Sequence, residues 1–188
     1  MKLSLLVIQI FFLGSTSLSA ATEEIVQCYD FGCKSTRSVE FRQAEWDSIR
    51  STFNPPALSP WLEKQQIRQA IALMEQYSGA LTGTYQDKAG NYSGADLPFQ
   101  QDCIDESTNT FQYLMALQNL ELLNWHEVGE KKRRIVWFAT HWSAVIRETA
   151  TQQLYAVDSW YRDNGEPPYI QKLEDWQRKR SFPVSLNP

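Results

Sequence analysis

Residues that bind metals are scarce in this chain, which has only two histidines and three cysteines among 188 residues. The one close pair of cysteines lacks a second pair of ligands nearby, so the sequence predicts no metal site, and we expect no other cofactor. Basic residues are also too few to favour nucleic acid as a partner, since 18 lysines and arginines stand against 22 acidic residues. Beyond residue 20 no apolar run is long enough to cross a bilayer, which argues against a stable membrane anchor.

The first twenty residues have the pattern of a secretory signal peptide. Met1 and Lys2 give a short basic start, residues 3–13 are almost wholly apolar, and mostly small and polar residues lead up to Ala20. The apolar stretch is too short to form a stable transmembrane helix. We therefore expect cleavage after Ala20 and an exported protein, with the periplasm as the expected compartment.

The remaining chain, residues 21–188, is expected to form one domain, because its 168 residues suit a single hydrophobic core. Cleavage removes one lysine and no acidic residue, which leaves 17 basic and 22 acidic residues and a net charge of −5. The basic run at residues 131–134 is flanked by Glu127 and Glu130, so we interpret it as a solvated hairpin turn. Nothing in the sequence indicates an oligomeric state.

Export would place the cysteines in an oxidising compartment, where close pairs tend to form disulfides. Cys28 and Cys33 bracket the sequence YDFG, in which Gly32 can take the backbone angles that let so short a loop close. We therefore expect a disulfide between Cys28 and Cys33. Cys103 is left unpaired, which is a liability in an exported protein unless the thiol is buried or used.

Cys103 is expected at the start of a helix. The stretch 79–98 is rich in Gly, Ser, Asp, Asn and Thr and is predicted to be a long loop, whereas apolar residues recur at helical spacing from Asp102 to Leu120. Asp102 suits the N-cap position, and Asp105 three residues later completes the pattern of a capping box. Cys103 is then the first helical residue.

Opposing influences are expected on the thiol of Cys103. The free amides and aligned dipoles of a helix N-terminus favour a thiolate, whereas the carboxylates of Asp102 and Asp105 disfavour it. A helix terminus contributes only about 0.3–1 kcal/mol, while one pKa unit corresponds to about 1.4 kcal/mol. A reactive thiol at this position therefore also needs a cationic partner.

His141 is the expected partner of Cys103. It lies in RIVWFATHWSAVIRE, which predicts two strands, whereas His126 lies in NWHEVGE, which we interpret as a polar connection. A further strand, QLYAVDSW, carries Asp158. With a turn at residues 149–150, His141 faces Asp158 directly; with a register two residues away, His141 lies diagonal to Asp158 on the same face. Either register keeps the two side chains within reach.

Three further helices are predicted, two of them in the N-terminal half. Residues 39–53 have apolar residues at helical spacing and are followed by prolines, and Ser59 with Pro60 marks the start of a helix that runs to about Tyr77. Residues 173–180 suit a short amphipathic helix that carries Trp176. We expect an α+β fold in which the N-terminal helices pack on a small antiparallel sheet.

Three segments, DCIDESTNTFQYLMALQNL, THWSAVI and LYAVDSW, together resemble the transglutaminase-like cysteine peptidases of bacteria, within the wider papain-like group. In that family the nucleophile opens a helix in a Cys-x-Asp context, the histidine begins a strand, and an aspartate ends the next strand. The resemblance covers about residues 60–165 and implies a papain-like core with a triad of Cys103, His141 and Asp158. The glycine that usually precedes the family's Cys-x-Asp motif is replaced here by Gln101 and Asp102.

The resemblance implies acyl transfer, in which His141 takes the proton of Cys103 and Asp158 orients the ring. The oxyanion candidates are the backbone amide of Cys103 and the side chains of Gln100 and Gln101. The expected function is an exported thiol-dependent hydrolase or acyltransferase that acts on amide bonds of a peptide or protein. The alternative is a non-catalytic exported binding domain that keeps the same fold.

Overall fold

The computed structural model describes residues 23–136 and 139–179 and has an α+β architecture with two antiparallel sheets. The expected signal peptide lies outside these residues. The strands are β1 (Ile25–Tyr29), β2 (Ser35–Val39), β3 (His126–Val136), β4 (Ala139–Glu148), β5 (Leu154–Asp158) and β6 (Tyr169–Lys172). The helices are α1 (Gln43–Ser51), α2 (Pro60–Thr82), α3 (Cys103–Asn119) and α4 (Leu173–Gln177), with a short 3-10 turn at Thr84–Gln86. None of the helices in the described ranges is long and apolar enough to cross a bilayer.

The larger sheet is a meander in the order β3-β4-β5-β6, with each strand antiparallel to the next. The turn between β4 and β5 is longer than the two residues expected. It is closed by a hydrogen bond from the amide of Glu148 to the carbonyl of Gln153, at 2.9 Å. Ala144 therefore pairs with Val157, which is the second of the two registers considered. The longer turn leaves His141 diagonal to Asp158 and on the same face of the sheet.

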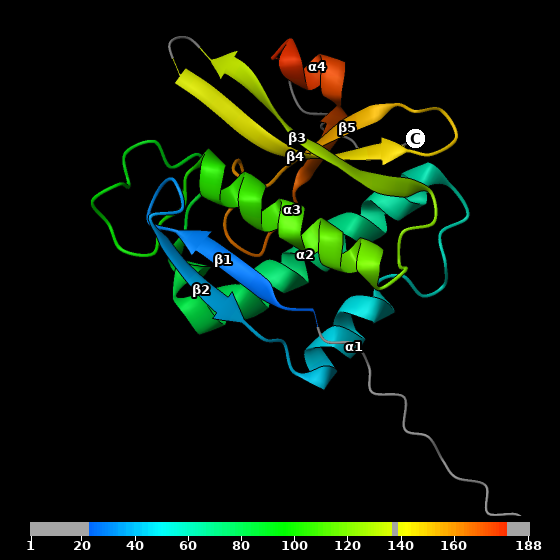
Figure 1. Cartoon of the computed structure of the whole chain (residues 1–188), viewed down its shortest axis with the longest axis horizontal. Coiled ribbons are helices and arrows are strands. Elements are labelled where there is room, and N and C mark those ends of the chain that lie inside the picture. Colours follow the sequence, from blue (N-terminus) through cyan, green and yellow to red (C-terminus); the bar gives the residue numbers. More distant parts are fainter. Residues whose placement is uncertain (1–22, 137–138, 180–188) are drawn as a thin grey trace, which may run out of the picture.

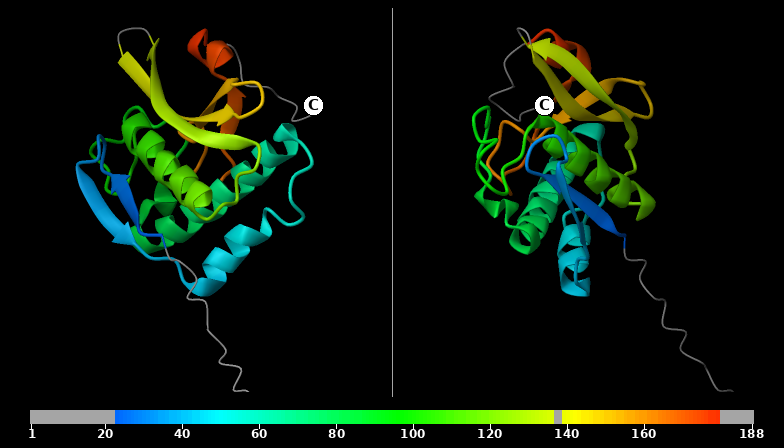
Figure 2. Two further views of the ribbon diagram at one scale, coloured as in Figure 1. Left: turned by 45° about the vertical axis from the view of Figure 1, so that its right-hand side comes forward. Right: turned by 60° about the vertical axis from the view of Figure 1, so that its left-hand side comes forward.

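Helices cover both faces of this sheet (Figure 1). Successive side chains of β4 and β5 point to opposite faces of the sheet. One set, Ala144, Ile146 and Val157, packs towards α3, while the opposite set, Val145 and Ala156, packs with Trp176 of α4. Figure 2 shows that α2 and α1 lie on the far side of α3 from the sheet. The expectation that the N-terminal helices pack on the sheet is therefore only partly right, since α2 contacts it at β6 and, through Glu63, at β3, whereas α1 packs on α2.

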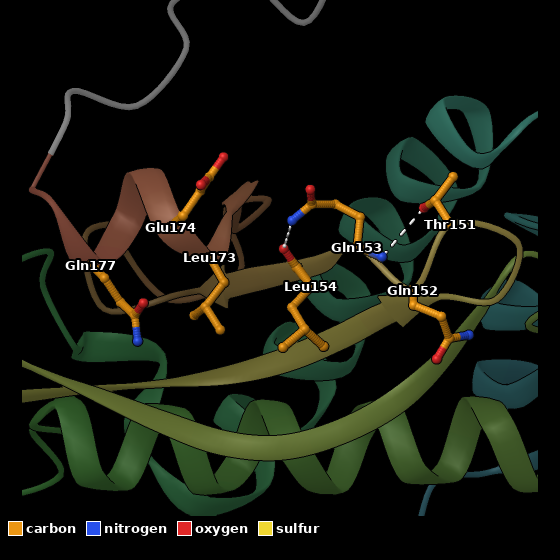
Figure 3. A pocket seen from close by; sticks show the side chains of 7 residues that line it. All are labelled: Thr151, Gln152, Gln153, Leu154, Leu173, Glu174 and Gln177. Atoms are coloured by element: carbon orange, nitrogen blue, oxygen red, sulfur yellow. Dashed lines mark hydrogen bonds between the residues drawn. The ribbon is translucent and has the colours of Figure 1, made fainter.

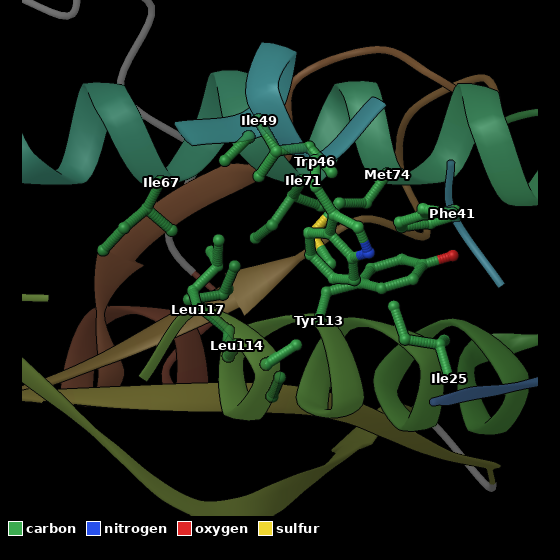
Figure 4. Packing of buried hydrophobic residues seen from close by; sticks show 14 of the residues in the cluster. Ile25, Phe41, Trp46, Ile49, Ile67, Ile71, Met74, Tyr113, Leu114 and Leu117 are labelled. Atoms are coloured by element: carbon green, nitrogen blue, oxygen red, sulfur yellow. The ribbon is translucent and has the colours of Figure 1, made fainter. Parts of the chain in front are cut away.

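The main hydrophobic core fills the space between α1, α2 and α3 (Figure 4). Helix α2 begins where the sequence predicts, with Ser59 as N-cap, its hydroxyl accepting from the amide of Leu62 at 3.3 Å, and Pro60 at the first turn. It continues to Thr82, five residues beyond the predicted end, and stops at Gly83, whose φ of +98° suits a residue without Cβ. The fully buried side chains here include Trp46, Ile49, Ile67, Ile71, Met74, Tyr113, Leu114 and Leu117.

The sequence prediction missed the β1–β2 hairpin, which lies alongside α3. Val39, predicted to open a helix, instead ends β2, and α1 begins at Gln43. The turn of the hairpin contains the disulfide between Cys28 and Cys33, which confirms the predicted pairing. Asp30, Phe31, Gly32 and Cys33 all have positive φ, so this five-residue closure places several non-glycine residues in the left-handed region.

Two local predictions for the segment 124–136 are wrong. The basic run at residues 131–134 belongs to β3 rather than to a turn, and its last residue, Arg134, is buried. His126 does not lie in a polar connection but opens β3, where its side chain is fully buried. Both errors arise because β3 is eleven residues long and passes over α3 and α4, so polar residues are covered by tertiary packing that their sequence pattern does not indicate.

His126 is buried because Glu63 of α2 provides its partner. The Glu63 carboxylate accepts from the Nδ1 of His126 at 2.9 Å and from the backbone amides of Asn124, Trp125 and His126. These bonds fix the chain where it leaves the loop after α3 and enters β3. We therefore assign Glu63 and His126 a structural role and not a catalytic one.

Glu63→Ala is expected to lower the free energy of unfolding by roughly 3–5 kcal/mol, because it leaves three backbone amides and a buried histidine without their acceptor. Urea unfolding followed by tryptophan fluorescence measures the loss. The matched control is Glu40→Ala, which removes an exposed carboxylate and should leave the midpoint almost unchanged. Equal losses in the two variants would show that Glu63 does not anchor β3.

Candidate active site

Cys103 is the first residue of α3, as the sequence predicts, and the cap around it is complete. Asp102 is the N-cap, and its carboxylate accepts from the amides of Ile104 at 2.9 Å and Asp105 at 3.0 Å. The Asp105 carboxylate accepts in return from the amide of Asp102 at 3.1 Å. The backbone amide of Cys103 takes no part in these bonds, so it remains available as a donor beside the thiol.

The thiol of Cys103 is half-buried and lies against strand β4. Its Sγ donates to the carbonyl oxygen of Thr140 at 3.7 Å, and the backbone N–H of Trp142 faces the sulfur. Burial raises the pKa of the Cys103 thiol, and the carboxylates of Asp102 and Asp158 add to the increase, while the N–H of Trp142 opposes it. The sequence anticipated the effect of Asp102; that of Asp158 comes from the fold.

His141 and Asp158 form a buried pair on the same face of β4 and β5. The Nε2 of His141 donates to Oδ2 of Asp158 at 2.7 Å, and the two side chains are only 4% and 1% exposed. The diagonal register of the strands brings them together, as expected. A carboxylate on one ring nitrogen holds the proton on that nitrogen and leaves the other as an acceptor.

The second ring nitrogen of His141, Nδ1, is buried and has no hydrogen-bond partner. The Nε2 of His126 is in the same state, so the missing partner alone does not distinguish the two histidines, and the position of His141 in the fold has to do so. His141 belongs to the same stretch of β4 as Thr140, whose carbonyl accepts from Cys103. The thiol therefore lies beside the backbone of the strand that carries His141, and it donates to that strand and not to the ring.

Aromatic side chains surround the His141 ring. The ring centroids of Trp160, Tyr161 and Trp176 lie 4.9, 5.1 and 5.7 Å from that of His141. Tyr92, from the loop that precedes α3, meets Trp160 edge to face at 4.5 Å. The indole N–H of Trp160 is buried without an acceptor, whereas that of Trp176 donates to Asp158. These rings exclude water from the pair, which strengthens its electrostatic interactions.

The residues that precede Cys103 are held by the disulfide hairpin. The side-chain amide of Gln101 donates to the carbonyl of Cys28 at 3.0 Å, and that of Gln100 donates to the carbonyl of Gln86 at 3.2 Å. Both predicted oxyanion candidates thus bind backbone carbonyls through their Nε2 atoms. The Cys103 amide, which the cap leaves unused, is the better placed of the three candidates.

Asp105 links the hairpin to α3 directly, because its Oδ1 accepts from the amide of Cys33 at 2.5 Å. Cys28, Cys33 and Asp105 are also the one group of three potential metal ligands among residues 23–136 and 139–179 whose ligand atoms lie within 4.8 Å. The two sulfurs are bonded to each other, so neither can act as a thiolate ligand. This group serves to fix the helix terminus.

A set of buried carboxyl groups that the sequence prediction missed lies near the first turn of α3. Burial raises the pKa of Glu75 to about 8, of Asp87 to about 7 and of Asp105 to about 6. Burial also raises the pKa of Glu106 well above its ordinary value, with the charges of its carboxylate neighbours adding to the effect. Acidic residues at positions 75, 87 and 106 carry no sequence signal for this, because only the fold brings α2, the following loop and α3 together.

Two open pockets lie away from Cys103. One is formed by the turn between β4 and β5 together with α4 (Figure 3). Its lining is mainly amide and hydroxyl side chains, and Cys103, His141 and Asp158 are not among the residues that line it: Thr151, Gln152, Gln153, Leu154, Leu173, Glu174 and Gln177. The other is a small surface hollow beside the disulfide turn, lined by Asp30, Lys34 and residues 95–98. Neither pocket contains a group with evident chemistry.

Asp102→Asn is expected to lower the pKa of the Cys103 thiol, because asparagine keeps the cap but removes a negative charge that disfavours the thiolate. The pH dependence of alkylation by iodoacetamide should therefore move to lower pH. Asp47→Asn, which removes an exposed charge on α1, should leave the curve in place. A curve unmoved by Asp102→Asn would contradict the arrangement at the helix terminus.

Stability should fall as the pH rises from about 5 to about 8. The pKa values of Glu75 and Asp87, about 8 and about 7, lie above the unfolded values, so ionisation above the unfolded pKa favours the unfolded chain. Glu75→Gln removes one of these groups and should reduce the loss, with little effect at pH 5. The loss is measured from the thermal unfolding midpoints of the unsubstituted protein and of Glu75→Gln between pH 4.5 and 8.5. If the two midpoints fall with pH in parallel, Glu75 does not ionise as a buried group.

Known proteins do not identify this site. No family model matches the chain, and neither a curated protein nor a solved structure is significantly similar to it. The functional conclusion therefore depends on the geometry of Cys103, His141 and Asp158.

Proposed function

We propose that this chain is an exported thiol-dependent hydrolase or acyltransferase that acts on peptide or protein amide bonds. Cys103 is the nucleophile, His141 the general base and Asp158 the group that orients the histidine. The observation that carries the proposal is that the Cys103 thiol, at the start of α3, contacts the strand that carries His141, whose Nε2 is bound to Asp158 at 2.7 Å while its buried Nδ1 has no partner. A ring held in this way is prepared to accept a proton at one defined atom.

In the proposed reaction, the Cys103 thiol leaves the carbonyl of Thr140 and gives its proton to Nδ1 of His141. Catalytic hydrogen bonds are often long or misdirected before substrate binds, so the present contact of the thiol with Thr140 is compatible with this step. The imidazolium then supplies the positive charge that the helix terminus alone does not provide. Its charge counteracts Asp102 and Asp158, both of which disfavour the thiolate.

The thiolate attacks an amide carbonyl, and the backbone amide of Cys103 stabilises the oxyanion. As the C–N bond breaks, the proton moves from Nδ1 of His141 to the departing amine and a thioester remains on Cys103. Water or a second amine then attacks the thioester, which restores the thiol and gives hydrolysis or transamidation respectively. These steps, the helix-borne nucleophile and the strand-borne histidine fit the proposed likeness to transglutaminase-like cysteine peptidases.

Export of the protein is part of the same proposal. The Cys28–Cys33 disulfide is typical of proteins that fold in an oxidising compartment, and the N-terminal pattern agrees with secretion to the periplasm. In such a compartment a free thiol is exposed to oxidation. The half-buried position of Cys103 limits this exposure.

One observation favours the second candidate, a non-catalytic exported binding domain. Burial and two carboxylates raise the pKa of Cys103, and its thiol donates to Thr140 rather than to His141. If the imidazolium does not form, the thiol stays protonated and the site is inert. Reactivity of Cys103 near neutral pH therefore separates the two functions.

His141→Ala should raise the pKa of Cys103 and lower its alkylation rate at pH 7 by at least about a hundredfold, because general-base assistance typically contributes 10²–10⁴-fold. His126→Ala should retain most of the alkylation rate, since His126 pairs with Glu63 and not with the thiol. The two histidine variants are compared at a temperature at which both are folded. Cys103→Ser gives the background. An alkylation curve that His141→Ala leaves unchanged would favour the binding domain.

A further inference from the structure

The hydrogen bonding of Asp158 extends to the C-terminal helix. The indole N–H of Trp176 in α4 donates to Oδ2 of Asp158 at 2.7 Å, and the same oxygen accepts from Nε2 of His141 at 2.7 Å. The Trp176 side chain is completely buried. Because one carboxylate oxygen accepts both bonds, the orientation of the carboxylate, and through it that of the His141 ring, depends on the indole.

Trp176 is itself held from a second side by Arg134 of β3. The guanidinium Nη1 of Arg134 donates to the backbone carbonyl of Trp176, and its Cζ lies 4.6 Å from the centroid of the indole ring. Arg134 is the cross-strand partner of His141, so both side chains project from one face of the sheet. Its second nitrogen, Nη2, donates to the hydroxyl of Tyr161 at 2.9 Å. This buried arginine fixes α4 over the pair of His141 and Asp158.

We propose that Trp176 is a positioning residue for the His141–Asp158 pair, which it holds in the tautomer that leaves Nδ1 of His141 free to accept the proton of Cys103. This inference rests on the proposed function. An indole N–H is a donor at every accessible pH and cannot accept a proton. Trp176 therefore orients Asp158 without taking part in proton transfer, and the segment of β6 and α4 becomes an integral part of the site.

Trp176→Phe tests the role, because phenylalanine keeps most of the apolar packing and lacks the N–H. The ring of His141 should change from a single Nε2–H tautomer to a mixture, as seen in ¹⁵N spectra of the imidazole nitrogens. The chain has only two histidines, so His126, which is bound to Glu63, serves as an internal reference that should not change. The alkylation rate of Cys103 at pH 7 should fall about tenfold to a hundredfold.

Trp46→Phe is the matched control. Trp46 is as deeply buried as Trp176, but its Nε1 has no hydrogen-bond partner, so the same substitution removes no bond to the site. It should leave the His141 tautomer and the Cys103 rate within about twofold of the unsubstituted protein. Unchanged tautomer and rate in Trp176→Phe, or equal changes in the two variants, would overturn the proposed role.

The unsubstituted protein provides a second measurement that remains informative if Trp176→Phe does not fold. The indole N–H signal of Trp176 should be shifted downfield and protected from exchange, because it donates to Asp158. Asp158→Ala should move this signal. If no indole signal moves in Asp158→Ala, the inference is overturned. The tautomer readout does not depend on catalysis. If Cys103 proves unreactive while Trp176→Phe still alters the His141 ring, the proposed function fails and the positioning role stands.

Discussion

The capped N-terminus of α3 is the constraint on which the rest of the site depends. Asp102 and Asp105 satisfy the first amides of the helix, and Asp105 also accepts from the amide of Cys33 in the disulfide turn. One turn further along, Asn109 pairs with both backbone groups of Cys28. The helix that carries Cys103 is thus fastened to the hairpin on one side and packed on β4 on the other, which fixes the sulfur beside the strand that contains His141.

The same cap creates an electrostatic conflict. Asp102 stabilises the helix as a neighbour of the amides but disfavours the thiolate next to it, and burial acts in the same direction. Burial raises the pKa values of Glu75, Asp87 and Glu106, so these carboxyl groups add negative charge to this region only as the pH rises. A site of this kind can generate a thiolate only with an imidazolium beside it, so acid–base chemistry at His141 decides between an enzyme and an inert domain.

Long-range polar contacts join the sheet to the helices alongside the apolar packing of the core. Glu63 of α2 orders the entry to β3, and Arg134 of β3 orders α4. Each contact joins residues that are distant in sequence and buries a charged group whose partners must be satisfied. The sheet is therefore connected to the helices on both of its faces, and the pair of His141 and Asp158 lies between strands whose ends are secured by these contacts.

The sequence by itself determined the local features that short-range physics controls: the N-cap at Asp102, the start of α2 at Ser59, the short disulfide loop and the two strands that carry His141 and Asp158. Capping residues, helical periodicity and loop closure act within a few residues, so their patterns are legible in the chain. Only the tertiary structure decided the register of β4 and β5, the burial of His126 and Arg134, and the bond from Trp176 to Asp158. These depend on which polar groups meet when distant segments pack, because a buried group is stable only with a partner that its own sequence neighbourhood does not supply.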